Sequence, residues 1–210
     1  MKHIENLIAR YPVLEEIRPS LVAAFELLEN CYSHGGKLLV AGNGGSCADA
    51  EHIAGELMKG FCKKRAVSPA FGEALQQIDP ELGKMLSASL EGGLPTVALS
   101  SQSSLASAVM NDTDPYGVFA QQVYGLGAEG DVFWGISTSG NSRNVLMAAV
   151  TAKAKGMRVL ALTGAAGGRL SELADVCIRV PETETYMVQE LHLPVYHCLC
   201  LLLEDRFFRE

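Results

Sequence analysis

The sequence has no excess of positive charge. It carries 17 Lys and Arg against 24 Asp and Glu, which gives a formal net charge of -7. Proteins that hold a nucleic-acid backbone by bulk electrostatics need clustered positive surface. The charge balance therefore argues against a nucleic-acid partner, and any phosphate that this chain recognises is expected to be a small one.

The sequence also lacks the segments that direct a chain into or across a membrane. No stretch approaches the roughly 20 apolar residues that span a bilayer. The start, from Met1 to Asn6, has no basic segment followed by an apolar one. We therefore expect a cytoplasmic protein with no membrane partner.

No CxxC pair occurs among the cysteines, and most of them lie in apolar stretches that suit reduced, buried thiols. We interpret them as packing residues. Cys47 falls in the first turn of an expected helix, where the helix dipole can lower a thiol pKa, but packing is favoured there as well. The six cysteines are Cys31, Cys47, Cys62, Cys177, Cys198 and Cys200.

Two nucleotide signatures are missing too. The chain has neither the GxxxxGKS/T pattern of a nucleoside-triphosphate loop nor the GxGxxG pattern of a dinucleotide site. Both absences count against a nucleotide cofactor. Among phosphorylated ligands, sugar phosphates fit the sequence better.

Short apolar runs alternate with helical patterns along most of the chain. Their continuous hydrophobicity indicates strands buried on both faces. The expected strands are 37–41, 96–100, 131–136, 158–162 and 176–180. The expected helices are 19–31, 47–59, 116–125, 142–155 and 168–174. This order predicts an α/β fold with a five-stranded parallel sheet flanked by helices, doubly wound and flavodoxin-like.

The length and the 48% hydrophobic content suit one domain over residues 1–210, beginning with a helical segment at about 1–35. Residues 61–95 interrupt the alternation with an irregular excursion, in which only 80–90 has a helical pattern. A connection this long inside a compact domain is often functional. We expect either a lid or a simple surface insertion.

The run from Leu38 to Ser46 joins an apolar strand to the turn Gly42-Asn43-Gly44-Gly45-Ser46. Glycines allow close backbone approach, and Ser46 can cap a helix whose free N–H groups favour an anion. We call Gly42 to Ser46 the first cradle. Alone, it could be a tight turn that binds nothing.

A second turn repeats this logic from Ser137 to Ser142, which we call the second cradle. Its sequence Ser-Thr-Ser-Gly-Asn-Ser supplies four hydroxyls, more than one helix cap needs. The alternative is a serine-rich loop that satisfies only its own backbone. Both cradles follow expected strands, and ligands of such sheets bind beyond the carboxyl ends of the strands. The pair therefore predicts a phosphate monoester site.

Polar groups in two helical stretches complete the candidate set. His52 and Glu56 are four residues apart and share a helix face, where they could meet a ligand, a metal or only solvent. Gln189, His192 and His197 interrupt an apolar C-terminal stretch. A histidine in such a stretch is as often a core residue as a catalyst.

Together, these motifs resemble the sugar isomerase (SIS) domain family, and within it the phosphoheptose isomerase group. The resemblance covers nearly the whole chain except 61–95. It rests on Gly42–Ser46, His52–Glu56, Asn111-Asp112, Gly135–Ser142, Leu162–Gly164, Ile178–Pro181 and Gln189–His192, in the family's order.

The resemblance implies an aldose–ketose isomerase that converts sedoheptulose 7-phosphate to D-glycero-D-manno-heptose 7-phosphate through an enediol. It implies a homotetramer with active sites at subunit interfaces. Glu56 and His197 would be the acid/base pair. Zinc would be held by His52, Glu56, Gln189 and His197. The substrate would contact Asn43, Gly44, Gly45, Ser46, Asn111, Asp112, Ser137, Thr138, Ser139, Ser142 and Gln189.

Two departures from the family pattern bear on which sugar is bound: the 61–95 excursion and Tyr186-Met187 before Gln189. The excursion could close over a different sugar or extend an oligomer contact. Two alternative functions stay open: a phosphosugar-binding regulator or adaptor, and an enzyme for another phosphosugar reaction. The presence of Glu56 and His197 counts against a regulator without catalysis.

Overall fold

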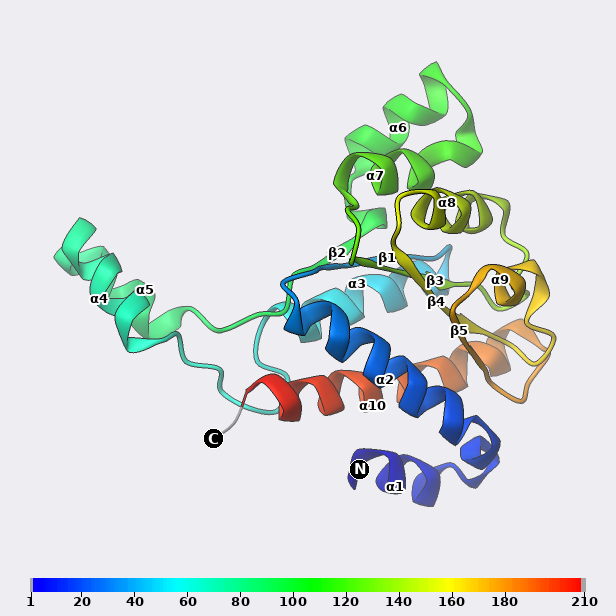
Figure 1. Cartoon of the computed structure of the whole chain (residues 1–210), viewed down its shortest axis with the longest axis horizontal. Helices are drawn as coiled ribbons and strands as arrows, with labels where there is room; N and C mark the ends of the chain where they lie inside the picture. Colours follow the sequence, from blue (N-terminus) through cyan, green and yellow to red (C-terminus); the bar gives the residue numbers. More distant parts are fainter. Residues whose placement is uncertain (1, 209–210) are drawn as a thin grey trace.

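The computed structural model describes residues 2–208 and has one five-stranded sheet at its centre. The strand order is β2-β1-β3-β4-β5 and every neighbouring pair is parallel, so the expected α/β fold is confirmed. Figure 1 shows the sheet between two layers of helices. The strands are β1 (Leu38–Ala41), β2 (Thr96–Ala98), β3 (Val132–Ile136), β4 (Arg158–Thr163) and β5 (Val176–Arg179).

One layer of helices covers the sheet face formed by Leu38, Val40 and Trp134. Its long members are α2 and α10, and a proline at 194 lies inside α10. In Figure 1 this layer lies below the sheet, with α1 outermost. The layer comprises α1 (Lys2–Arg10), α2 (Arg18–Ser33), α3 (Gly45–Met58) and α10 (Thr185–Phe207), with a 3-10 turn at Pro12–Ile17.

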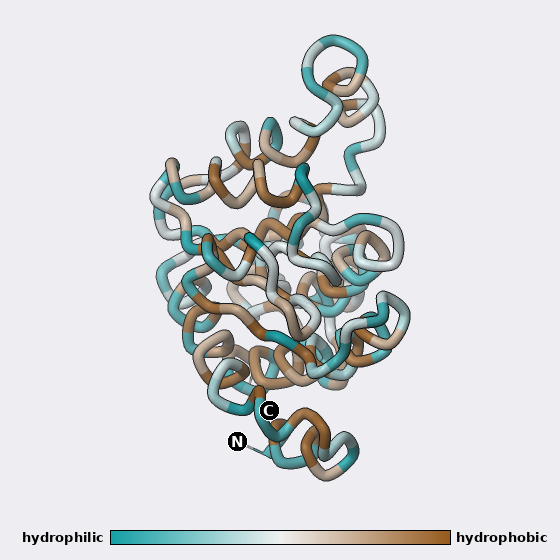
Figure 2. The backbone as a smooth tube through the Cα atoms, turned by 90° about the vertical axis from the view of Figure 1, so that its right-hand side faces the viewer, coloured by the Kyte–Doolittle hydropathy of each residue, from teal (hydrophilic) through white to brown (hydrophobic). Residues whose placement is uncertain are grey.

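The other layer covers the alternate side chains of the same strands, Leu39, Ala41 and Phe133. This two-residue alternation splits the core into two clusters, one on each face of the sheet. The second layer comprises α6 (Ser103–Asp112), α7 (Val118–Leu126), α8 (Arg143–Ala154) and α9 (Gly168–Leu173), with 3-10 turns at Leu99–Ser101 and Pro115–Gly117. Figure 2, turned by 90°, shows the layers stacked from α6 at the top to α1 at the bottom.

The 61–95 excursion is a helical hairpin rather than an irregular segment. Its helices are α4 (Pro69–Ile78) and α5 (Pro80–Ser89), and only the second was expected. Asp79 joins them and caps α5 by accepting hydrogen bonds from two backbone N–H groups. Figure 1 shows the hairpin projecting from the body, away from the carboxyl ends of the strands. Within one protomer it therefore stands apart from the cradles and does not cover them.

The second strand and the segment after it also differ from expectation. The chain leaves β2 after Ala98 and forms a 3-10 turn, so this strand is shorter than the expected 96–100. The serine-rich segment Ser103–Asp112 forms α6, which the sequence pattern did not predict. Within the described residues, no helix is both long and apolar enough to cross a membrane.

Candidate active site

The first cradle turns the chain sharply from β1 into α3. Gly44 has a φ of 55°, a conformation that favours glycine, and α3 begins at Gly45. A side chain at Gly42 would collide with the backbone of Ser46. The geometry of this turn therefore requires glycine at positions 42 and 44. Ser46 does not cap α3 as expected, because it lies inside the first turn of the helix and is buried. The backbone N–H groups of Ser46 and Cys47 already donate to the backbone oxygens of Asn43 and Gly44.

The second cradle connects β3 to α8. The hydroxyls of Ser137 and Ser142 lie 3.0 Å apart and share a hydrogen bond. Gly140 has a φ of 66° and packs against the backbone of Gly167. The loop is thus folded back on itself, with Thr138 and Ser139 between its two bonded ends.

The two cradles meet. β1 and β3 are neighbours in the sheet, and their following helices cover opposite faces. This is the topological switch point at which doubly wound sheets bind ligands. Asn43 Nδ2 donates to Asn144 Oδ1 at 3.0 Å, and Asn144 Nδ2 donates to Asn43 Oδ1 at 2.8 Å. Asn144 was not among the predicted site residues, because nothing in the sequence shows that it faces Asn43.

Gln189 lies beside the first cradle. Its side-chain amide fills the space that a Cβ on Gly45 would need. A glycine at position 45 therefore lets α10 approach the start of α3. This position fits contact with a ligand in the cradle.

The predicted acid/base residues lie side by side, near the other end of the α3–α10 pair. His197 Nε2 is 3.2 Å from Glu56 Oε1, and His52 Nε2 is 2.9 Å from the same oxygen. Glu56 is only 6% exposed. Burial raises the pKa of Glu56, which the nearby His52 partly counters, and burial lowers the pKa of His197.

These three side chains also fit a metal ion. Their ligand atoms all lie within 4.8 Å of one another. Glu56 Oε2 is buried without a hydrogen bond, and His197 Nε2 has no hydrogen bond beyond its 3.2 Å contact with Glu56 Oε1. Gln189 is not part of this group, because eight residues of α10 separate it from His197, or roughly 12 Å of helix.

Tyr196 hydrogen-bonds to His52 on the ring nitrogen that does not face Glu56. The Tyr196 hydroxyl shares a hydrogen bond of 2.9 Å with His52 Nδ1, which fixes the ring and leaves Nε2 facing Glu56. The same hydroxyl faces Asp49, whose pKa burial raises to about 6. Sequence reasoning missed Tyr196, although a tyrosine next to His197 in an apolar helix was a usable signal.

Asn111 and Asp112 lie at the end of α6 and are exposed. Their side chains hydrogen-bond to each other at 2.7 Å and, within the described chain, to no cradle residue.

His192 is fully buried, and burial lowers its pKa to about 4, which agrees with a neutral core residue. A cavity of about 510 Å³ between α1 and α10 reaches His197 and includes Arg10.

Residues 2–79 and 87–164 match the SIS domain family. A phosphoheptose isomerase of Aneurinibacillus thermoaerophilus is 38% identical over 98% of this chain and 88% of its own. Solved phosphoheptose isomerase structures are also similar. One from Neisseria gonorrhoeae has 34% identity and a TM-score of 0.71, covering 95% of this chain and 94% of its own. One from Francisella tularensis has 31% identity and a TM-score of 0.76, covering 97% and 95%.

Proposed function

The chain belongs to the SIS domain family and, within it, to the phosphoheptose isomerases, and on this basis we propose that it interconverts sedoheptulose 7-phosphate and D-glycero-D-manno-heptose 7-phosphate. It is an aldose–ketose isomerase. The observation that carries the proposal is the 3.2 Å contact between Glu56 on α3 and His197 on α10, since α3 is the helix that the first cradle begins.

Moving a carbonyl from C2 to C1 requires one carbon-bound proton and one oxygen-bound proton to move. Glu56 takes the proton from C1 of the ketose while His197 protonates O2, which gives the enediol. His197 then takes the proton from O1 as Glu56 delivers its proton to C2, and the aldose forms. Burial raises the pKa of Glu56, which makes it a stronger base than an exposed carboxylate.

The cradles would hold the phosphate. Serine and threonine hydroxyls, together with the backbone N–H of Gly45 at the start of α3, suit its acceptor oxygens. Asn111 and Asp112 would contact the sugar. The cradle residues in this role are Asn43, Gly44, Gly45, Ser46, Ser137, Thr138, Ser139 and Ser142, with Gln189 beside them.

His52, Glu56 and His197 would hold a zinc ion, and Glu56 Oε2 is buried without a hydrogen bond. When bound, zinc would polarise the sugar carbonyl and stabilise negative charge on its oxygen. Gln189 would join this zinc site only from another protomer. Within one protomer, eight positions of α10 separate Gln189 from His197, or roughly 12 Å of helix. Titration of the apo protein with zinc against a chromophoric chelator tests this site. His52→Ala should weaken binding, and the exposed His34→Ala is the control.

We also propose a homotetramer whose active sites combine neighbouring protomers. Glu56 is ten residues beyond Ser46 on α3, which is roughly 15 Å of helix. One protomer therefore presents its phosphate cradles and its acid/base pair at separated positions. Assembly would bring the cradles of one copy to the acid/base pair of another.

The cytoplasm is the proposed location, since all six cysteines are free and reduced thiols are maintained there.

Turnover of sedoheptulose 7-phosphate by the purified protein tests the function directly, alongside a panel of other sugar phosphates. Loss of turnover in Glu56→Gln and His197→Ala is the expected result. Binding of the sugar without conversion by the wild type would contradict the proposal and favour a regulator.

A further inference from the structure

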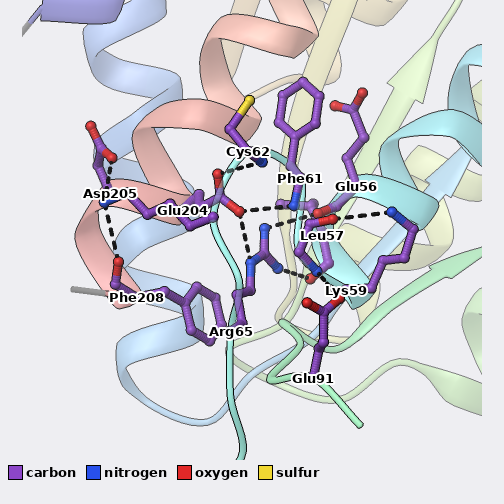
Figure 3. Close-up of polar contacts among 12 residues, drawn as sticks. Glu56, Leu57, Lys59, Phe61, Cys62, Arg65, Glu91, Glu204, Asp205 and Phe208 are labelled. Atoms are coloured by element: carbon purple, nitrogen blue, oxygen red, sulfur yellow. Dashed lines mark hydrogen bonds and ion pairs between the residues drawn. The ribbon is translucent and has the colours of Figure 1, made fainter. Parts of the chain in front are cut away.

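A buried carboxylate on α10 accepts hydrogen bonds from the segment that follows α3. Glu204 is 1% exposed and lies seven residues, about two helical turns, after His197. It accepts hydrogen bonds from the backbone N–H groups of Phe61 and Cys62, both at 2.9 Å. It also accepts from Arg65 Nε at 3.0 Å. Figure 3 shows these three donors converging on one carboxylate.

The guanidinium of Arg65 continues the network to the end of α3. Arg65 is 2% exposed. Its Nη2 donates to the backbone oxygen of Glu56 at 2.9 Å, and its Nη1 donates to that of Leu57 at 2.8 Å. These carbonyls belong to the last turn of the helix, where no intrahelical donor remains. One side chain therefore links α10 to the backbone of the proposed base (Figure 3).

The same carboxylate acts on the proposed acid through Phe61. The Phe61 ring lies 5.6 Å from the His197 ring, centre to centre. Glu204 holds the backbone of Phe61, and the ring that Phe61 places beside His197 is tilted by 45° to the imidazole. Both members of the acid/base pair thus have a direct structural connection to the Arg65–Glu204 ion pair.

We propose that Arg65 and Glu204 are positioning residues for the isomerase reaction. Their ion pair holds α3 and α10 in the register that places Glu56 Oε1 against His197 Nε2. A buried ion pair gives little net stability compared with apolar residues of the same size, so stability alone does not account for it. Its directed hydrogen bonds specify one arrangement of the two helices, which apolar packing does not. The inference rests on the proposed function.

The chain contains a closely matched control. Asp131 is 3% exposed and accepts hydrogen bonds from the backbone N–H groups of Lys37 and Ala128, at 2.9 and 2.8 Å. It also pairs with Lys37 Nζ. Like Glu204, it is a buried carboxylate with two backbone donors and one cation. It directly precedes β3, and its partners Lys37 and Ala128 belong to neither α3 nor α10.

The test compares Glu204→Gln with Asp131→Asn at a temperature where both are folded. Both variants should lower Tm. Glu204→Gln should lower kcat at least tenfold, because misplacement by about 1 Å can cost on the order of a hundredfold. Its KM should stay within about twofold, since the cradles are unchanged. Asp131→Asn should keep the wild-type kcat. Equal kcat in both variants would overturn the proposal.

Arg65→Lys gives a second variant should Glu204→Gln fail to fold. Lysine keeps the charge but lacks the planar fork that reaches Glu204 and both carbonyls together. Its kcat should fall while its KM stays near that of the wild type. Wild-type kcat in a folded Arg65→Lys variant would overturn the proposal.

A measurement without substrate separates this proposal from the proposed function. The ring signals of the five histidines can be followed by NMR. Glu204→Gln should shift the signals of His52 and His197, and Asp131→Asn should leave them in place. Unshifted signals in Glu204→Gln would overturn the positioning role, whereas lack of turnover by the wild type would overturn only the proposed reaction.

Discussion

Asn43 and Asn144 exchange two side-chain hydrogen bonds, of 3.0 and 2.8 Å, across the switch point between β1 and β3. The pair joins the first cradle to the first turn of α8. Asn144 Oδ1 also accepts from the backbone N–H of Val145, which fixes its orientation. The two loops proposed to grip one phosphate are therefore tied to each other.

Removing this link should weaken substrate binding more than catalysis. Asn144→Ala leaves Asn43 without its partner and lets the cradles separate, which we expect to raise KM for sedoheptulose 7-phosphate about tenfold. The kcat should change little, because Glu56 and His197 are untouched. Steady-state kinetics measure both constants. Asn30→Ala, at an exposed position on α2, should match the wild type. A fall in kcat with unchanged KM would contradict the interpretation.

Hybrid oligomers should recover activity if the active site is shared. Glu56→Gln removes the base and Ser137→Ala damages the second cradle, so each homo-oligomer should be nearly inactive. Coexpression should restore activity well above either parent, because some sites would combine an intact cradle with an intact base. Activity per purified hybrid is the measurement.

The control hybrid pairs Glu56→Gln with His197→Ala. These residues meet within one protomer, so each protomer in this hybrid has a broken acid/base pair. No rescue is expected. Failure of the first hybrid to exceed its parents would argue that each protomer uses its own cradle and base.

His192 should make the protein sensitive to acid. Burial lowers its folded-state pKa from 6.5 to about 4, so between these values the unfolded chain binds more protons. Stability is therefore lost as pH falls below about 6.5, by roughly 2–3 kcal/mol at pH 4.5. Urea unfolding at pH 7 and 4.5 should show a smaller loss in His192→Leu than in the wild type. His34→Gln, at an exposed position, should keep the full loss. An equal loss in His192→Leu would show that this ring does not titrate as inferred.

Much of the fold could be predicted from hydrophobic pattern alone. Strands such as β3 and β4 are continuous apolar runs, because both faces of the sheet are covered. Segments with weaker patterns were missed. α6 begins with two serines, which are typical of loops, and α4 begins with a proline and has mixed polarity. Both segments are nevertheless helices. Tertiary packing decides such segments, which a local pattern does not record.

The site was predicted unevenly for a similar reason. The cradles have local signatures, and Glu56 and His197 were assigned through the resemblance; the structure places them together, while their roles stay predictions. Arg65 ends the basic run Lys63-Lys64-Arg65, and nothing in the sequence shows that it is buried against Glu204. Contacts between segments more than 100 residues apart gave no signal in one sequence.

The central claim is that Glu56 moves a proton between C1 and C2. NMR of sedoheptulose 7-phosphate turnover in D₂O tests it most directly, because a proton held on a carboxylate exchanges with solvent. The wild type should form the aldose with deuterium at C2. Glu56→Gln should be slower by about 10²- to 10⁴-fold, and the exposed neighbour Glu51→Gln should not. Turnover by Glu56→Gln at the wild-type rate, or an aldose that keeps the original hydrogen throughout, would contradict the account.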